Sequence, residues 1–415
     1  MAAPDTPPIH PREAAPRPSQ RALAVEPFHA MAFAERAARL RAEGHHVVAL
    51  SLGEPDDGAP PAVLAALHEV TDGRPLPYTA ALGLPALREA IARRYRERHG
   101  VDLDPRRVVV TSGASAALLL VMALVVDPGD DVLMADPSYP CNRQLVRALG
   151  GRAVEVQTSP ATRYQLSAAA AAAAWTPATR AVLVATPSNP TGTTVPEAEL
   201  AAICRLARER GAWRVVDEIY LDLADPVADP VANSVHGEPP RSALALDDGA
   251  VVIGSFSKHT GMTGWRLGWC VVPEHAVDVA EQLAANFFIC ASTPAQHAAL
   301  AAFTPESLAL VEARRLDLRS RRALVLDGLA RAGLEVPVPP DGAFYVYVDV
   351  SATDLGAWEF CERLLAEAHV ALTPGRDFGA GTAETHVRLS YAASRADLEE
   401  GLARLERFVA SLRRS

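Results

Sequence analysis

Short apolar runs alternate with longer amphipathic stretches between residues 107 and 272. The short runs are rich in valine and have the length of buried strands; they lie at 108–110, 132–135, 181–185, 215–217 and 251–254. Apolar residues with helical spacing follow two of these runs, at 115–126 and 197–210. Continuously apolar strands are typical of a sheet that is covered on both faces. The pattern therefore predicts an α/β domain with a mostly parallel sheet and crossover helices.

The pattern changes after residue 304, where regular alternation of strands and helices ends. A long helix rich in arginine and glutamate is predicted first, and further elements follow it: helix 305–332, strand 343–350, helix 357–369, strand 386–391 and helix 395–412. This order of elements predicts a second, smaller α+β unit.

Charge and hydropathy exclude several classes of protein. The 415 residues include 40 basic and 50 acidic ones, and the formal net charge of −10 repels nucleic acid and anionic lipid. The longest uncharged apolar run, 114–126, is shorter than the roughly 20 residues that cross a bilayer, so it predicts a buried helix. Residues 1–25 are rich in proline, arginine and alanine and lack an apolar signal core, which predicts a disordered extension. We expect neither a nucleic-acid nor a membrane partner.

Five cysteines are spread widely along the chain, and none forms a CxxC pair or a cysteine–histidine cluster with the spacing of zinc ligands. They are Cys141, Cys204, Cys270, Cys290 and Cys361. This usage predicts reduced, mostly buried thiols in a cytoplasmic protein that binds no metal.

Lysine occurs once in the chain, at Lys258, and every other basic residue is arginine. A bias toward arginine explains the missing lysines but not the one that remains. Arginine cannot lose its proton or form an imine, whereas a desolvated lysine amine can attack a carbonyl carbon. Lys258 is therefore a candidate nucleophile, and the alternative is a surface lysine that remains by chance.

Polar residues gather after three of the predicted strands, at the edge where open α/β sheets bind ligands. The segment 111–115 is a small-residue turn before a helix, where free N–H groups and the helix dipole suit a phosphate. Alternatively, Ser112 is simply the N-cap of that helix. The segment 255–258 places two serines beside the lysine, and Arg266 follows it. These groups together could hold a phosphate near a nucleophilic amine.

Asp217 ends the strand at 215–217, where it either caps the next turn or meets a buried cation. A phosphate site, an imine-forming lysine and a carboxylate opposite a protonated ring nitrogen are the three features that pyridoxal phosphate requires. Each cluster is ambiguous alone, and together they favour this cofactor.

Motifs in the same order and spacing resemble fold-type I pyridoxal-phosphate aminotransferases of class I. They cover nearly the whole chain after residue 25: SLGEPD (51–56), YTAALGLPALREAI (78–91), TSGAS (111–115), ADPSYP (135–140), TPSNPTG (186–192), VVDEIY (215–220), SFSKHTGMTGWRLGW (255–269), DGAFYVY (341–347) and VRLSYA (387–392). The resemblance implies a large cofactor-binding domain over 61–304 with a mostly parallel seven-stranded sheet. A smaller α+β domain would combine 26–60 with 305–415.

The resemblance also implies roles for individual residues around the cofactor ring. Lys258 would form the Schiff base with the cofactor and then move a proton at the substrate Cα. Asp217 would keep the pyridine nitrogen protonated, which compensates its buried charge. Tyr220 and Asn189 would donate to the phenolic oxygen, and Tyr139 would stack on the ring.

Further residues would bind the cofactor phosphate and the substrate. The implied phosphate ligands are Gly113, Ala114, Ser115, Ser255, Ser257 and Arg266. Tyr78 resembles the tyrosine that reaches the phosphate of a neighbouring subunit, which implies a homodimer. Arg388 would hold the substrate α-carboxylate, helped by the main chain near Gly53 and by Asn189.

The implied reaction is transfer of an amino group from an amino acid to a 2-oxo acid. Ser115 stands where aspartate-specific relatives have a lysine for the distal carboxylate, which favours a small neutral or apolar donor such as alanine. A C–S β-lyase is the first alternative because bond cleavage depends on alignment with the ring rather than on the fold. A cofactor-binding regulator is the second, and the acidic chain and its short leading segment argue against it.

Overall fold

The computed structural model describes residues 16–27, 29–226 and 240–413. The strands are β1 (Val48–Ala49), β2 (Val108–Thr111), β3 (Asp131–Asp136), β4 (Arg152–Gln157), β5 (Thr179–Ala185), β6 (Trp213–Asp217), β7 (Val251–Ser255), β8 (Gly268–Val271), β9 (Tyr345–Asp349), β10 (Val370–Ala371), β11 (Thr373–Pro374) and β12 (His386–Ser390). The helices are α1 (Gln20–Leu23), α2 (His29–Ala42), α3 (Pro61–Val70), α4 (Pro85–His99), α5 (Ala114–Val125), α6 (Pro140–Ala148), α7 (Ala168–Ala174), α8 (Glu197–Glu209), α9 (Val277–Phe288), α10 (Thr293–Ala299), α11 (Pro305–Ala332), α12 (Ala357–Ala368) and α13 (Arg395–Leu412).

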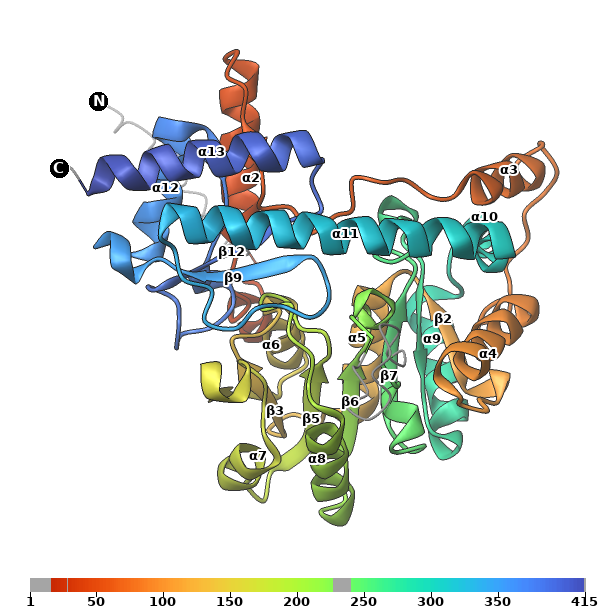
Figure 1. The fold of residues 1–415 in the computed structure, drawn as a ribbon. Helices are drawn as coiled ribbons and strands as arrows, with labels where there is room; N and C mark the ends of the chain where they lie inside the picture. The colour runs from red at the N-terminus through yellow and green to blue at the C-terminus, as the bar shows by residue number, and fades with distance from the viewer. Residues whose placement is uncertain (1–15, 28, 227–239, 414–415) are drawn as a thin grey trace, which may run out of the picture.

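A seven-stranded sheet forms the centre of the molecule, in the order β2-β8-β7-β6-β5-β3-β4 (Figure 1). β8 runs antiparallel to both of its neighbours, β2 and β7, and the other pairs are parallel. The predicted α/β fold with a mostly parallel sheet is therefore confirmed. The edge strand β4 was not predicted because its residues are only partly buried and give no continuous apolar run.

Helices cover both faces of this sheet, and successive side chains of one strand pack into different cores. In β7, Val251 and Ile253 join the core beneath α5 and α9, whereas Val252 joins the core that includes residues of α4, α8 and α10. This arrangement explains why the central strands are apolar throughout. The predicted buried helix at 114–126 is confirmed as α5.

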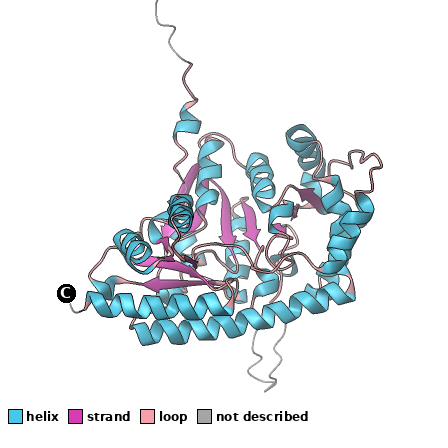
Figure 2. Cartoon of the chain, turned by 90° about the horizontal axis from the view of Figure 1, so that it is seen from above, coloured by secondary structure: helices cyan, strands magenta, loops and turns pink. Residues whose placement is uncertain are grey.

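The packing on both faces of the central sheet is counted as the first core, and a second core unites the N-terminal segment with the C-terminal part of the chain. β1 pairs with β10 in parallel, and a separate antiparallel sheet has the order β11-β12-β9. Phe33 and Leu50 share this core with residues of α12 and α13, and α11 lies beside α13 (Figure 2). This core supports the division into 26–60 with 305–415 and 61–304, which stays a prediction. Of the predicted extension 1–25, residues 1–15 lie outside the described part, and α1 lies in the remainder.

Two further findings concern the described residues. No helix among them is long and apolar enough to cross a membrane. They also contain no group of three or more histidine, cysteine, aspartate or glutamate side chains that could hold a metal ion.

Candidate active site

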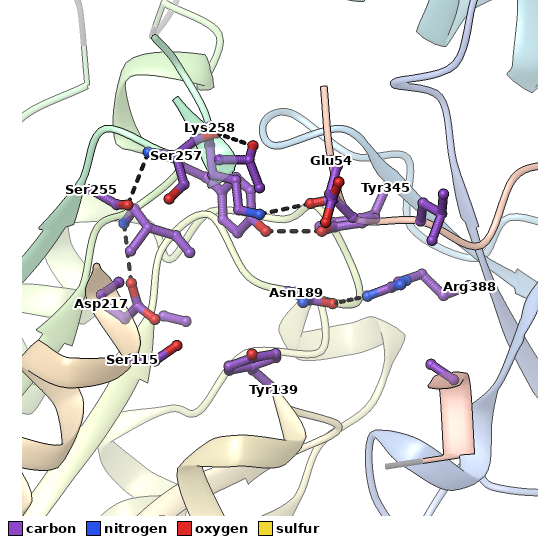
Figure 3. Close-up of a pocket in the computed structure, with 18 of the residues that line it drawn as sticks. Glu54, Ser115, Tyr139, Asn189, Asp217, Ser255, Ser257, Lys258, Tyr345 and Arg388 are labelled. Atoms are coloured by element: carbon purple, nitrogen blue, oxygen red, sulfur yellow. Dashed lines mark hydrogen bonds between the residues drawn. The ribbon is translucent and has the colours of Figure 1, made fainter. Parts of the chain in front are cut away.

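A cavity of about 290 Å³ lies where the central sheet meets the second core, and it brings together residues from distant parts of the chain (Figure 3). The predicted site residues that line it are Gly53, Ala114, Ser115, Tyr139, Asn189, Asp217, Tyr220, Ser255, Ser257, Lys258, Arg266 and Arg388. Gly113 lies next to this lining, against Arg266. Tyr78 is not part of the lining, and 76% of it is exposed.

Lys258 enters the cavity from the turn that follows β7. Its Nζ donates a hydrogen bond to the main-chain carbonyl of Gly53 at 2.7 Å. Burial lowers the pKa of Lys258 to about 8, because the charged ammonium is poorly solvated there. A larger share of neutral amine is therefore present near pH 7 than on an ordinary lysine.

Asp217 lies at the end of β6, and 4% of it is exposed. Its Oδ1 accepts the N–H of Ile219 at 3.1 Å, so it caps the turn, which was the simpler of its two predicted roles. Burial raises the pKa of Asp217 to about 6, although the Ile219 N–H and the charge of Lys258 oppose this. The described residues place no ion-pair partner within bonding distance of this carboxylate. A cation bound in the cavity would compensate its charge.

Small residues and one guanidinium form the other end of the cavity. Gly113, with φ of +84°, precedes the first turn of α5, and a Cβ there would lie 2.6 Å from Arg266 Nη2. Ser255 Oγ accepts the N–H of Ser257 at 3.0 Å, which orients the turn that leads to the lysine. The free N–H groups of a helix start, two hydroxyl groups and an arginine suit a phosphate dianion.

Arg388 is held from several sides on β12. Its Nη1 donates to Asn189 Oδ1 at 2.8 Å (Figure 3). Its Nη2 donates to the Ser51 carbonyl at 2.7 Å. The guanidinium carbon lies 4.4 Å from the ring centre of Tyr345 and 5.0 Å from that of Phe378. Within the described part of the chain, buried Arg388 Nε has no hydrogen-bond partner. Nη1 carries a second N–H besides the one bonded to Asn189, and this donor can bind a carboxylate.

The cavity also includes residues for which no role was expected from the sequence. Tyr345 OH bonds to Tyr220 OH at 2.9 Å, and its motif DGAFYVY was the signal that could have identified it. Glu54 was within the quoted SLGEPD motif and also lines the cavity. Ala30, Met31 and Ala34 of α2 line it too, and no local sequence signal marks them. Their place depends on how α2 packs against the second core.

Comparison with known proteins agrees with this geometry. The family model for class I and II aminotransferases matches residues 45–405. The chain belongs to this family. Its members use pyridoxal 5′-phosphate, and this enzyme is a pyridoxal-phosphate-dependent aminotransferase that acts on amino acids and 2-oxo acids.

Relatives of this aminotransferase include named enzymes and solved structures. Valine–pyruvate aminotransferase of Mycobacterium tuberculosis is 42% identical over 383 residues, which cover 92% of this chain and 96% of that protein. Aspartate/prephenate aminotransferase of Thermus thermophilus is 36% identical, covering 94% and 98%. The crystal structure of an aminotransferase from M. tuberculosis has a TM-score of 0.89 and 40% identity, covering 96% of this chain and 100% of that one.

The cavity of this aminotransferase fits the cofactor. The uncompensated carboxylate of Asp217 suits a protonated ring nitrogen, and the amine of Lys258 suits the cofactor's aldehyde. Gly113 leaves the space beside Arg266 that a phosphate group needs. The described residues therefore include a suitable partner for each of the three parts of the cofactor: the ring nitrogen, the aldehyde and the phosphate.

Proposed function

We propose that this aminotransferase takes the amino group from a small neutral or apolar amino acid, such as alanine, and passes it to pyruvate or 2-oxoglutarate. One observation carries the proposal: among the described residues, the basic side chains that line the cavity are Lys258, Arg266 and Arg388. Each of these has a role with the cofactor or the α-carboxylate, so the described lining of one chain offers no further cation for a distal carboxylate. Ser115 lines the cavity at the position where aspartate-specific relatives have a lysine.

The rest of the cavity wall favours an apolar side chain. Its apolar members include Ala30, Met31, Ala34, Leu52, Leu118 and Ile219. A wall of this kind gains roughly 1–3 kcal/mol for each methylene that it accommodates. The relative named valine–pyruvate aminotransferase supports an apolar donor, although another is named aspartate/prephenate aminotransferase.

We assign the cofactor-binding roles as follows. Asp217, ionised, pairs with the ring nitrogen, and Tyr139 stacks on the ring. Tyr220 and Asn189 donate hydrogen bonds to the phenolic oxygen. The phosphate is bound by Gly113, Ala114, Ser115, Ser255, Ser257 and Arg266.

The substrate roles follow from the same geometry. When bound, the cofactor withdraws electrons from the substrate Cα and so acidifies its proton. Arg388 orients the substrate through its carboxylate, assisted by Asn189 and the main chain at Gly53. Lys258 Nζ, as the neutral amine, takes the proton from Cα and delivers it to the adjacent cofactor carbon. A depressed pKa of Lys258 increases the share of amine that can act as this base.

We further propose that the enzyme is a homodimer in which Tyr78 binds the phosphate of the partner's site. The exposure of Tyr78, at 76%, supports this role because its side chain is free to contact a second chain. The five cysteines are free, which supports a cytoplasmic location.

The test is the absorption spectrum of the cofactor-loaded enzyme with single amino acids and no 2-oxo acid. Alanine and valine should convert the bound cofactor to its amine form and release one equivalent of 2-oxo acid per site. Aspartate and glutamate should react more slowly at equal concentration. A faster reaction with aspartate would refute the apolar preference. Release of ammonia and homocysteine from cystathionine, or of ammonia and sulfide from cysteine, would support the lyase alternative.

A further inference from the structure

Residues 375–381 form a junction that is bonded to the carboxyl end of β3 in the central sheet. The N–H of Ser138 donates to the carbonyl of Phe378 at 2.8 Å. Asp136 Oδ2, at the end of β3, accepts the N–H groups of Ala380 and Gly381 at 3.0 Å each. The junction is therefore held beside the segment that leads to Tyr139 in the cavity.

Asp377 in this junction holds the start of α2. Its Oδ1 accepts the N–H of His29 at 2.8 Å, and its Oδ2 accepts the N–H of Ala30 at 2.7 Å. Arg143 Nη2 donates to the Asp377 carbonyl at 2.6 Å, and only 2% of Asp377 is exposed. The first N–H groups of a helix have no partner inside it, and a carboxylate there also meets the positive end of the helix dipole.

α2 has one face in the core and another on the cavity. Phe33 and Ala37 are buried in the second core. Met31 and Ala34 line the cavity, and 57% of Met31 is exposed. The packing of Phe33 fixes the rotation of the helix, and the bonds to Asp377 fix the position of its first turn.

The same junction contacts the residue that binds the substrate carboxylate in the proposed function. Phe378 follows Asp377 and lies 5.0 Å from the guanidinium of Arg388. This segment therefore contacts both Arg388 and the start of α2, and it contributes to the distance between Arg388 and the wall formed by Met31. Because a substrate held by Arg388 must fit its side chain into the remaining cavity, this distance limits side-chain length.

We propose that Asp377 is a positioning residue that sets the side-chain length preference of the enzyme by holding Met31 of α2 against the cavity. This inference rests on the proposed function. Asp377 does not line the cavity, and its proposed effect on the substrate is exerted through the helix.

The experiment compares the cofactor-loaded wild type with Asp377→Asn, Met31→Ala and the double variant. An amide at position 377 turns an N–H₂ group toward one of the two N–H donors of α2 and weakens the cap. The quantity measured is the ratio of kcat/KM for norleucine to that for alanine. Each single variant should raise this ratio at least about fivefold. The double variant should raise it no further than the larger single effect, because both changes act through Met31.

Asp104→Asn is the matched control. Asp104 accepts the N–H of Arg106 at 2.8 Å at the start of a short helix, and it does not line the cavity. This variant should leave the ratio within twofold of wild type. Equal loss of kcat/KM for both substrates in Asp377→Asn, or additive effects in the double variant, would overturn the proposal.

Backbone amide hydrogen exchange gives a readout that does not depend on turnover. The backbone amides of residues 29–34 should exchange at least about tenfold faster in Asp377→Asn than in wild type. Their exchange rates should be unchanged in Asp104→Asn. Unchanged exchange at 29–34 in Asp377→Asn would also overturn the proposal. If the wild type transaminates no apolar amino acid, the proposed function fails, and the exchange result separately decides whether Asp377 holds α2.

Discussion

Burial acts on Lys258 and Asp217 in opposite directions. It lowers the pKa of the amine to about 8 and raises the pKa of the carboxyl to about 6. In both cases burial disfavours the charged form. Burial in the cavity therefore increases the share of neutral Lys258 amine, which can react as a nucleophile. It also leaves the Asp217 carboxylate without solvation, so that a cationic partner stabilises its ionised form.

Replacement of the sole lysine tests its chemistry directly. We expect Lys258→Ala to reduce the transamination rate at least about 10³-fold, because it removes both the nucleophile and the base. Lys258→Arg should be equally inactive, since a guanidinium keeps its proton. Stopped-flow absorbance with alanine measures the rate. Gel filtration shows whether the variants still bind the cofactor without a covalent link. Turnover within tenfold of wild type in either variant would remove Lys258 from the mechanism.

Glu218 makes stability depend on pH. Burial raises its pKa from 4.5 to about 8, although the Ala243 N–H and the Ser242 hydroxyl oppose this. Between these two values the folded state retains a proton that the unfolded state has released, so the free energy of unfolding falls as pH rises. This loss should be complete near pH 8, and below pH 4.5 the proton is bound in both states.

Glu218→Gln should remove this dependence. We expect its Tm minus that of wild type to increase by at least about 2 °C between pH 5 and pH 8, with cofactor in excess. Calorimetric scans at several pH values measure the difference. The control is Glu69→Gln, at an exposed position on α3. Its Tm minus that of wild type should stay constant between pH 5 and pH 8. A constant difference for Glu218→Gln as well would contradict the expectation.

At the scale of elements, the start of α5 is the feature that matters for cofactor binding. The helix follows β2 directly, so its first N–H groups face the carboxyl edge of the sheet. Gly113 makes the sharp entry with φ of +84°, and its missing side chain lets Arg266 approach the main chain. A glycine is needed both for the backbone angle and for this approach.

Gly113→Ala should raise the Kd for pyridoxal phosphate at least about tenfold, because the new methyl group displaces the Arg266 guanidinium. Gly129→Ala is a matched control with φ of +95° and no atom within 4 Å of its Cβ. It should lower stability by about 1 kcal/mol and leave the Kd within twofold. Titration of each cofactor-free variant with pyridoxal phosphate, followed by absorbance, measures the two Kd values. Equal Kd values for the two variants would show that the space beside Arg266 is not needed for cofactor binding.

At the scale of the whole molecule, the cavity depends on parts that are far apart in the chain. Asn189, from the loop that follows β5 of the central sheet, and Arg388, from β12 of the C-terminal sheet, bond to each other. Gly53, from the N-terminal segment, accepts the bond from Lys258. The two cores must therefore pack together before the site exists, and in the proposed dimer a second chain completes it.

Mixed dimers test whether Tyr78 acts across the interface. Tyr78→Ala and Lys258→Ala homodimers should both have low activity. A dimer with one chain of each kind contains one site with an intact lysine and the intact tyrosine of its partner. Activity should therefore rise on mixing and refolding, toward about a quarter of the wild-type value in a statistical mixture. No gain on mixing would place Tyr78 outside the neighbouring site.

Much of this protein follows from its sequence alone. Continuous apolar runs predicted most strands of the central sheet, because residues buried on both faces must be apolar at every position. Lys258 stood out as the only lysine, and Asp217 followed from its place after a buried strand. These signals are local, so they can be recognised without knowledge of the fold. The ordered motifs identified the family, which the comparisons confirm.

Other features were decided only by tertiary structure. The antiparallel β8, the pairing of β1 with β10 and the cavity wall formed by α2 involve residues far apart in sequence. Periodicity reports which residues are buried, but it does not report against what they pack. The carboxylate of Asp377 meets α2 only because two segments nearly 350 positions apart fold onto one core. The sequence therefore determined the chemistry, and the packing of the two cores decided the shape of the space in which it occurs.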